Sequence, residues 1–159
     1  MHNTVLNLSN LVDRLNEHKK NNQRIVFTNG CFDILHVGHV RYLSEAKAQG
    51  DILVVGLNSD ASVHKIKEEQ RPIISQDQRA EILASLRCVD YVTLFDDADP
   101  LSLISAIKPD ILVKGADWQE DDIIGADVVK ENGGKVVRVP VVPESSTTDI
   151  IQTIIDKYT

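Results

Sequence analysis

No stretch of this chain narrows the choice of fold as far as DILVVGLNSD, residues 51–60. Its apolar core is continuous and does not alternate with polar residues, which is typical of a strand covered on both faces. Such strands belong to parallel sheets, whose crossover helices lie on the two sides of the sheet. The stretch therefore predicts an α/β domain.

Strand-like and helix-like runs alternate along the rest of the chain. Further strands are predicted at 25–27, 91–95, 111–113 and 135–142. Helices are predicted near 8–15, 40–48, 76–86, 101–107, 122–131 and 150–155. This alternation predicts a doubly wound, Rossmann-like fold with about five parallel strands. We expect the 159 residues to form a single domain, with an N-terminal helix and lead-in at 1–22 and the core of the domain at 24–159.

Charge and composition exclude several classes of protein. The formal net charge is −7, which argues against nucleic-acid binding, because that function requires a basic face. No apolar run is long enough to cross a membrane, and the N-terminus does not resemble a signal peptide. Cys31 and Cys88 lack metal-ligand spacing, so we expect no disulfide, no metal held by the protein and a cytoplasmic location.

Every unusual polar cluster follows a predicted strand. TNGCFD follows the first strand, NSD the second, KGADW the fourth and PESSTT the fifth. Ligands of doubly wound sheets bind outside the carboxyl ends of the strands, where the strand order reverses. We therefore expect one crevice to collect these clusters.

The stretch TNGCFDILHVGHVRYL, residues 28–43, indicates phosphate binding. A helix that begins near Val37 or Gly38 directs free backbone N–H groups and its positive dipole end into the crevice. His36 and His39 are three residues apart and lie on the same side of that helix start. Gly38 lets a phosphate approach the backbone.

These residues also carry a resemblance to a known family. GCFDILHVGH resembles the signature of the nucleotidyltransferases with an HxGH motif, the cytidylyltransferase-like enzymes. Within them, the chain is most similar to the heptose 1-phosphate adenylyltransferases. VGLNSDASVHKIKEEQRP, QDQRAEILASLRCVDYV, ILVKGADW and ESSTTDII look like later blocks of that family, in order. The resemblance covers the chain from about Arg24 onward.

The resemblance implies a reaction. A sugar phosphate oxygen attacks the α-phosphate of ATP, pyrophosphate leaves, and AMP transfer to heptose 1-phosphate gives ADP-heptose for cell-surface glycan (lipopolysaccharide) synthesis. Mg²⁺ is expected to enter bound to the nucleotide phosphates. A homodimer is implied by resemblance alone. Relatives are often fused to a sugar kinase domain, for which these 159 residues leave no room, so a separate kinase is expected to supply the sugar 1-phosphate.

The resemblance also assigns residues. The expected catalytic residues are His36, His39 and Lys67. The expected nucleotide-binding residues are Asn29, Cys31, Phe32, His36, Gly38, His39, Lys67, Gly115, Asp117, Ser146, Thr147 and Thr148. The expected acceptor-binding residues are Lys65, Arg79 and Lys114. An alternative interpretation of Arg79 is a surface pair with Asp77 or Glu81. The chain departs from many relatives at Glu68, where they have glycine, and at Ala116, where they read GGD.

Two alternative functions stay open from the sequence. A glycerol-3-phosphate cytidylyltransferase, or another sugar- or flavin-nucleotide synthase, would keep the chemistry and change the substrates. Similar cytidylyltransferases carry an arginine at the position of Val141, where it can donate a hydrogen bond to a pyrimidine carbonyl or to phosphate. Valine offers only apolar contact, so this position favours ATP over CTP as the substrate. A nucleotide-binding module without turnover is an alternative of another class. Intact His36 and His39 argue against it, because binding alone does not require both.

Overall fold

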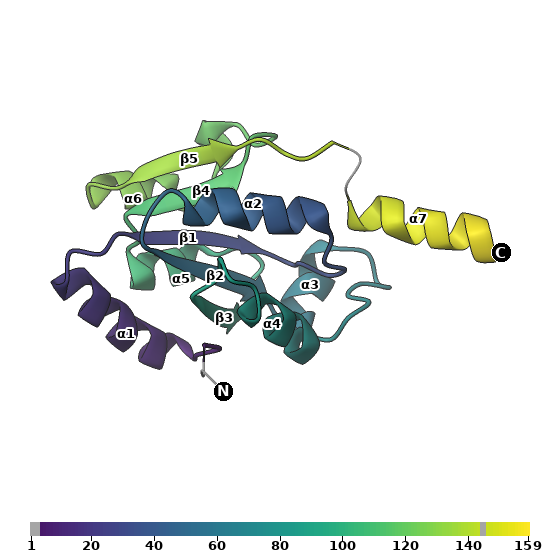
Figure 1. Cartoon of the computed structure of the whole chain (residues 1–159), viewed down its shortest axis with the longest axis horizontal. Helices are drawn as coiled ribbons and strands as arrows, with labels where there is room; N and C mark the ends of the chain where they lie inside the picture. The colour runs from purple at the N-terminus through teal and green to yellow at the C-terminus, as the bar shows by residue number, and fades with distance from the viewer. Residues whose placement is uncertain (1–3, 144–145) are drawn as a thin grey trace.

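The computed structural model describes residues 4–143 and 146–159 and contains one sheet of five strands in the order β3-β2-β1-β4-β5 (Figure 1). The strands are β1 (Ile25–Gly30), β2 (Ile52–Asn58), β3 (Tyr91–Phe95), β4 (Ile111–Gly115) and β5 (Lys135–Val139). All neighbouring strands are parallel. The predicted fold class and the number of strands are confirmed.

Helices cover both faces of the sheet, as the sequence of β2 requires. They are α1 (Leu8–Lys20), α2 (Val37–Lys47), α3 (Asp60–Ile66), α4 (Gln76–Ala84), α5 (Leu101–Ile107), α6 (Ala126–Glu131) and α7 (Thr147–Tyr158), with a 3₁₀ turn η1 (Glu120–Asp122). Apolar residues of α2 and α4 pack on one face, and those of α1, α5 and α6 pack on the other. All seven residues of β2 are buried, which explains its unbroken apolar run.

The strand order places a ligand crevice beside β1. The chain runs from β1 through β2 to β3 on one side, and β4 then pairs with β1 on its other side. Crossovers therefore leave β1 in opposite directions, and the carboxyl ends of β1 and β4 flank the gap between them. The strand-end clusters at 28–33 and 114–118 meet at this edge.

Two predicted elements differ from the structure. The helix predicted at 122–131 is divided into η1 and α6. Gly125, with φ of 88°, lies between them in the left-handed region, which an α-helix cannot include. The strand predicted at 135–142 ends at Val139, because Pro140 has no N–H to extend the ladder.

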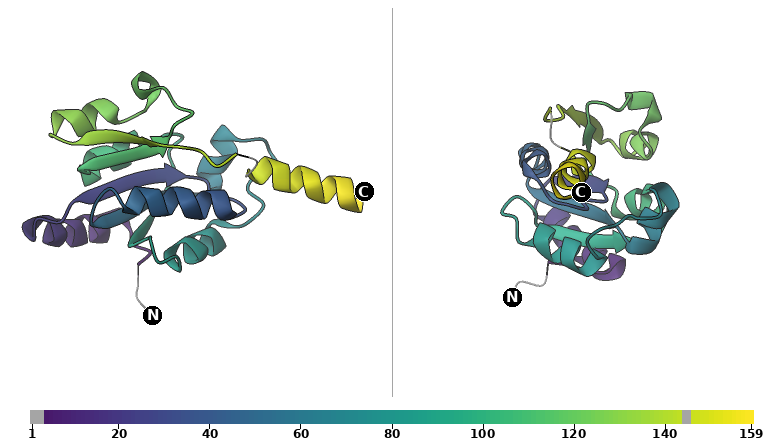
Figure 2. Two further views of the ribbon diagram at one scale, coloured as in Figure 1. Left: turned by 45° about the horizontal axis from the view of Figure 1, so that its top comes forward. Right: turned by 90° about the vertical axis from the view of Figure 1, so that its right-hand side faces the viewer.

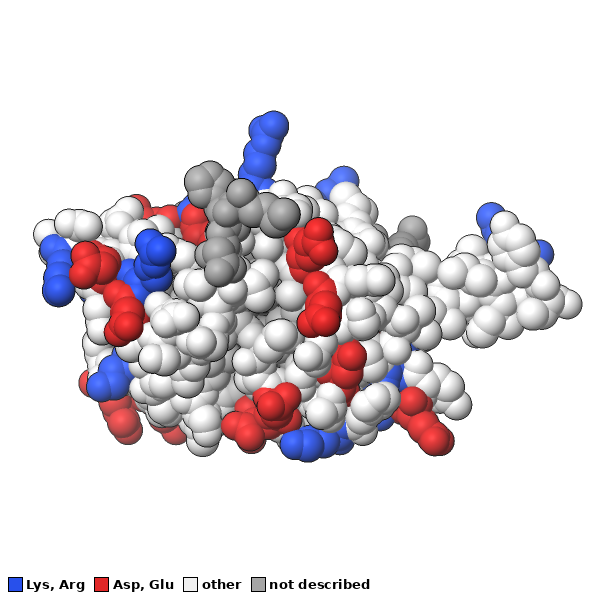
Figure 3. All heavy atoms as spheres, turned by 90° about the horizontal axis from the view of Figure 1, so that it is seen from below, with Lys and Arg blue, Asp and Glu red and all other residues white. Residues whose placement is uncertain are grey.

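The last helix projects away from the body of the domain, as Figures 1 and 2 both show. Only its first turn approaches the carboxyl edge of the sheet. Figure 3 shows the molecule from below, with α7 projecting beyond the body of the domain. On this face acidic and basic side chains are interspersed. Of the helices in the described part of the chain, none has the length and apolarity needed to cross a membrane.

Candidate active site

A cavity of about 770 Å³ opens at the carboxyl ends of β1 and β4. This volume lies within the range of small-molecule sites. The cavity brings together all of the sequence-predicted nucleotide-binding residues: Asn29, Cys31, Phe32, His36, Gly38, His39, Lys67, Gly115, Asp117, Ser146, Thr147 and Thr148. Lys114 also lines it, whereas Lys65 and Arg79 do not. Segments that lie more than 100 residues apart in the sequence thus share one cavity.

The two histidines form a hydrogen-bonded cap at the start of α2. The Gly38 N–H donates to His36 Nδ1 at 3.1 Å, and the His36 N–H donates to His39 Nδ1 at 3.3 Å. A neutral imidazole has one acceptor nitrogen and one donor nitrogen. Since both Nδ1 atoms accept, each ring carries its proton on Nε2. The cap therefore leaves two Nε2–H donors at a positive helix end.

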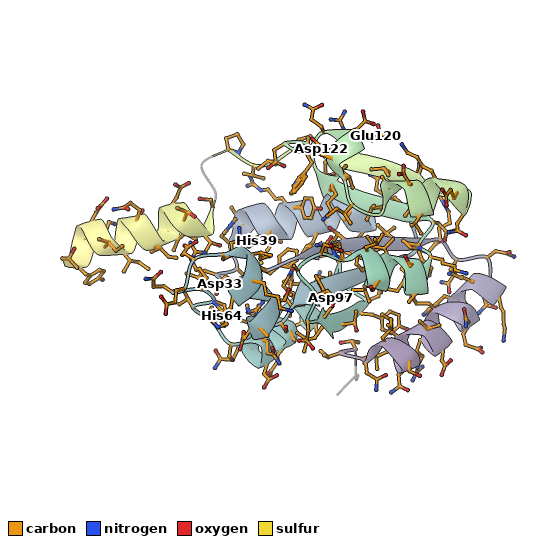
Figure 4. All side chains as sticks on the ribbon, turned by 180° about the vertical axis from the view of Figure 1, so that it is seen from behind. Asp33, His39, His64, Asp97, Glu120 and Asp122 are labelled. Atoms are coloured by element: carbon orange, nitrogen blue, oxygen red, sulfur yellow. The ribbon has the colours of Figure 1, made fainter. Side chains whose placement is uncertain are left out.

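Burial keeps both rings uncharged at neutral pH. Desolvation lowers the pKa of His36 from its ordinary value, and desolvation, followed by the charge of His36, lowers the pKa of His39 to about 4. Phe32 contributes to this burial, with its ring centroid 5.2 Å from that of His39 in an edge-on arrangement. The backbone of Phe32 has φ of 46°, an unusual conformation for a bulky residue. Figure 4 places His39 and Asp33 at the same end of the sheet.

A second helix start faces the same cavity. Ser146 is the N-cap of α7 and accepts a hydrogen bond from the Asp149 N–H. Thr147 donates its hydroxyl to the Ile34 carbonyl at 3.3 Å, which ties α7 to the loop before α2. The first turn of α7 therefore supplies hydroxyls and free N–H groups for anion binding. Glu144 and Ser145, also part of the ESSTTDII stretch, lie outside the described residues.

Lys114 lines the cavity at the end of β4. Its ammonium donates to Asn29 Oδ1 and lies 5.9 Å from the centroid of the Trp118 ring. Burial lowers the pKa of Lys114 to about 8. Beside it, a Cβ atom at Gly115 would lie 2.6 Å from Asp117 Oδ1, so glycine allows the Asp117 carboxylate to fold back over the strand end.

Lys67 and Lys65, the two lysines predicted to bind phosphate, differ in their position relative to the cavity. Lys67, at the C-cap of α3, lines the cavity. Lys65 lies outside the cavity lining and donates to the Asp96 carbonyl at 2.9 Å. Cys31 borders the cavity, and burial raises the pKa of its thiol, which disfavours the nucleophilic thiolate form.

Arg79 does not lie at the helix surface, where a pair with Asp77 or Glu81 was one expectation. Its side chain is 0% exposed and makes four hydrogen bonds, to Ile74 O, Cys31 O, Asn58 O and Asp60 Oδ1. These bonds join the ends of β1 and β2 to the segment before α4 and occupy four of the five N–H donors of the guanidinium. The geometry thus gives Arg79 a structural part beneath the cavity and does not support substrate binding by it.

Sequence reasoning missed two buried charged residues, Asp33 and Arg71, which both line the cavity. Asp33 accepts hydrogen bonds from the Ile73 and Ile74 N–H groups. It thereby fixes the loop that follows Arg71. The only signal in the sequence was the position of Asp33 in the cluster after β1. Arg71 stands in the charged loop KIKEEQRP and carries no mark that separates it from its neighbours.

Paired histidines and two helix starts at the reversal point of a parallel sheet define a phosphate-binding α/β domain. The cytidylyltransferase-like family model matches residues 27–155, so the chain belongs to the cytidylyltransferase-like family. It is 51% identical over 154 residues to "Bifunctional protein HldE" of Geobacter metallireducens, covering 97% of this chain and 31% of that protein. It is 58% identical over 130 residues to the protein of the same name from Helicobacter pylori, covering 82% and 27%.

The chain therefore spans about a third of the length of these curated relatives. A solved structure, described as the lipopolysaccharide core biosynthesis protein from Thermoplasma volcanium, superposes with a TM-score of 0.63. That protein is 30% identical, and the match covers 77% of this chain and 99% of the other. The resemblance predicted from the sequence, to the cytidylyltransferase-like enzymes, is confirmed.

Proposed function

We propose that this chain transfers AMP from ATP to a heptose 1-phosphate, releases pyrophosphate and yields ADP-heptose. The observation that carries the proposal is the hydrogen-bonded His36–His39 pair at a helix start inside a cavity of nucleotide size. Family membership supports nucleotidyl transfer. The similarity to proteins named HldE and to a lipopolysaccharide core biosynthesis protein supports a sugar phosphate as acceptor.

The proposed reaction is a single in-line displacement. An oxygen of the sugar phosphate forms a bond to the α-phosphorus of ATP as the bond from that phosphorus to the bridging oxygen of pyrophosphate breaks. The attacking phosphate is already ionised, so no protein base is required. The Nε2–H groups of His36 and His39 donate to phosphate oxygens and stabilise charge that grows in the transition state.

Two further groups hold the leaving pyrophosphate. Lys67 adds a cation from the end of α3, and the first turn of α7 adds the Thr147 and Thr148 N–H groups and the Thr148 hydroxyl. Lys114, which also lines the cavity, is proposed to bind the acceptor phosphate. Participation of Lys65 in acceptor binding would require its ammonium to leave the Asp96 carbonyl.

The base of the nucleotide is proposed to bind on an apolar wall formed by Ile123, Ile124, Val141 and Val142. Val141 is 53% exposed and offers no hydrogen-bond donor. A pyrimidine carbonyl would lose its hydrogen bonds to water there and gain no protein donor in return. Adenine has no carbonyl group, so its binding to the wall costs less free energy. This wall therefore supports ATP as the substrate in preference to CTP.

Mg²⁺ is proposed to arrive with ATP as part of the substrate. Within residues 4–143 and 146–159, no three His, Cys, Asp or Glu side chains cluster as metal ligands. Asp33 lines the cavity, but its carboxylate already accepts two backbone N–H groups. We therefore propose that the Mg²⁺ ligands are phosphate oxygens and water, which this ion prefers.

The setting of the reaction is also a proposal. Heptose 1-phosphate would come from a sugar kinase, which we propose to be a separate protein acting in the cytoplasm. A homodimer is proposed on family grounds alone.

The test is a pyrophosphate-release screen of the four nucleoside triphosphates and dATP against several sugar phosphates and glycerol 3-phosphate. We expect the fastest release with an adenine nucleotide and a heptose 1-phosphate. Release with CTP and glycerol 3-phosphate would replace the proposal with a cytidylyltransferase. Nucleotide binding without release in any pair would indicate a binding module.

A further inference from the structure

Two buried arginines lie near the cavity, and their hydrogen bonding differs sharply. The Arg79 guanidinium makes four hydrogen bonds of 2.6–2.9 Å. The Arg71 side chain is 10% exposed and lines the cavity, yet its side chain makes one hydrogen bond among the described residues, to Thr148 Oγ1 at 3.4 Å. A guanidinium has five N–H donors. Among the described residues Thr93 Oγ1 is the one buried side-chain polar atom without a partner, so the donors of Arg71 that make no hydrogen bond remain open to solvent and to a ligand.

The ion pairs of Arg71 are of unequal kinds. Asp33 lies 3.7 Å from Arg71 Nη1, beyond hydrogen-bonding distance, and its oxygens are already bound to the Ile73 and Ile74 N–H groups. Glu68 lies 3.2 Å from Arg71 Nε, and the Glu68 side chain is 58% exposed. The contact with Asp33 is therefore fixed and weak. The contact with Glu68 is made by an exposed carboxylate that water can replace.

From this arrangement we infer that Arg71 binds a phosphate group of the substrates, and that Glu68 occupies the guanidinium until the phosphate displaces it. This inference rests on the proposed function for the source of the phosphate. A phosphate presents several oxygens to the planar fork of arginine and pairs with it in bidentate form, whereas Glu68 reaches Nε alone. Thr148, which already contacts Arg71, lies at the anion-binding start of α7.

The inference predicts opposite effects at the two residues. Removing Arg71 removes an attractive partner, so anion affinity falls. Neutralising Glu68 removes a competitor, so anion affinity rises, but only while Arg71 is present. A double-mutant cycle of Arg71→Ala and Glu68→Gln isolates this coupling.

The probe is inorganic pyrophosphate, whose binding is measured by isothermal titration calorimetry. We expect Arg71→Ala to weaken binding at least about tenfold, in line with loss of a charge-assisted pair. Glu68→Gln should strengthen binding about threefold in the native background and have no effect when Arg71 is alanine. Arg71→Lys, which keeps the charge but not the fork, should bind at least about threefold more weakly than the native protein. Arg14→Ala, at an exposed position of α1, serves as the control and should bind normally.

Several results would overturn the inference. Unchanged pyrophosphate affinity in Arg71→Lys, or an equal effect of Glu68→Gln with and without Arg71, would leave Arg71 a purely structural residue. If Arg71→Ala unfolds, as thermal denaturation would reveal, the lysine and glutamine variants still decide. Steady-state KM values of the Arg71 variants then show which phosphate binds Arg71. A raised KM for ATP alone assigns the nucleotide phosphate to Arg71, and a raised KM for the sugar phosphate alone assigns the acceptor phosphate. Calorimetry needs no turnover, so failure of the proposed reaction would not obscure the binding result.

Discussion

The imidazole rings of His36 and His39 stack with their centroids 3.8 Å apart and their planes inclined at 26°. Each ring accepts a backbone N–H through Nδ1, so the first turn of α2 sets the orientation of both rings. Burial lowers the pKa of His39, and the neighbouring His36 ring lowers it further, because stacking at this distance disfavours two positive charges. The pair therefore acts as one unit with two neutral donors.

We predict that His39→Ala lowers kcat by about two orders of magnitude, as loss of a preorganised donor does, while the KM for ATP changes much less. The double variant with His36→Ala should cost little more than the worse single variant, because the rings orient each other. His64→Ala, at an exposed position of α3, is the control. Near-normal kcat in His39→Ala would remove the pair from the mechanism.

The low pKa of His39 predicts a pH dependence of stability. The folded-state pKa of about 4 lies below the ordinary 6.5, so the unfolded chain binds the proton more readily between these values. The free energy of unfolding should therefore be fully present above pH 6.5 and fall towards pH 4, with at most about 1.4 kcal/mol per pH unit from this residue. Urea titrations at several pH values should give a shallower fall for His39→Gln than for His64→Gln. Equal falls would contradict the burial of a neutral ring.

Lys114 predicts an alkaline limit to activity. Its pKa of about 8 means that the ammonium of the free protein loses its charge above pH 8, so kcat/KM for the sugar phosphate should decline there. Lys114→Arg should remove this decline, because a guanidinium stays charged. A pH profile of kcat/KM measures both. The same decline in the arginine variant would assign it to another group.

Lys65, in the last turn of α3, and Lys67, at its C-cap, are predicted to differ in their effect on the KM for ATP. Lys67 lines the cavity, so Lys67→Ala should raise the KM for ATP at least about tenfold. Lys65 is held by the Asp96 carbonyl, so Lys65→Ala should leave the KM for ATP nearly unchanged. Initial rates with each substrate varied in turn separate the effects. A larger ATP effect at Lys65 would mean that the loop rearranges on binding.

The sequence predicted the parts of the site that depend on local pattern. A continuous apolar strand such as β2 must be buried on both faces, and a polar cluster after each strand must reach the same edge of a parallel sheet. The start of α2 near Val37 followed from the glycine and histidines around it. Each of these features depends only on residues that lie close together in the sequence.

Features that depend on distant partners were not predictable. Nothing near Arg79 in the sequence indicates that it bonds to Cys31 and Asn58, 48 and 21 residues away. Nothing near Arg71 indicates a contact with Thr148, 77 residues away. The break at Gly125 was missed because an isolated glycine is tolerated in many helices, and only its φ of 88° reveals the turn.

The central claim is adenylyl transfer to a heptose 1-phosphate, and a competition between nucleotides tests it most directly. Equimolar ATP and CTP are incubated with the protein, Mg²⁺ and heptose 1-phosphate, and the two nucleotide sugars are quantified by mass spectrometry. Their ratio at early times equals the ratio of the kcat/KM values. Because the wall at Val141 offers no donor to a pyrimidine, we predict at least about tenfold more ADP-heptose than CDP-heptose, about 1.4 kcal/mol of transition-state preference. A comparable or larger yield of the cytidine product would contradict the account.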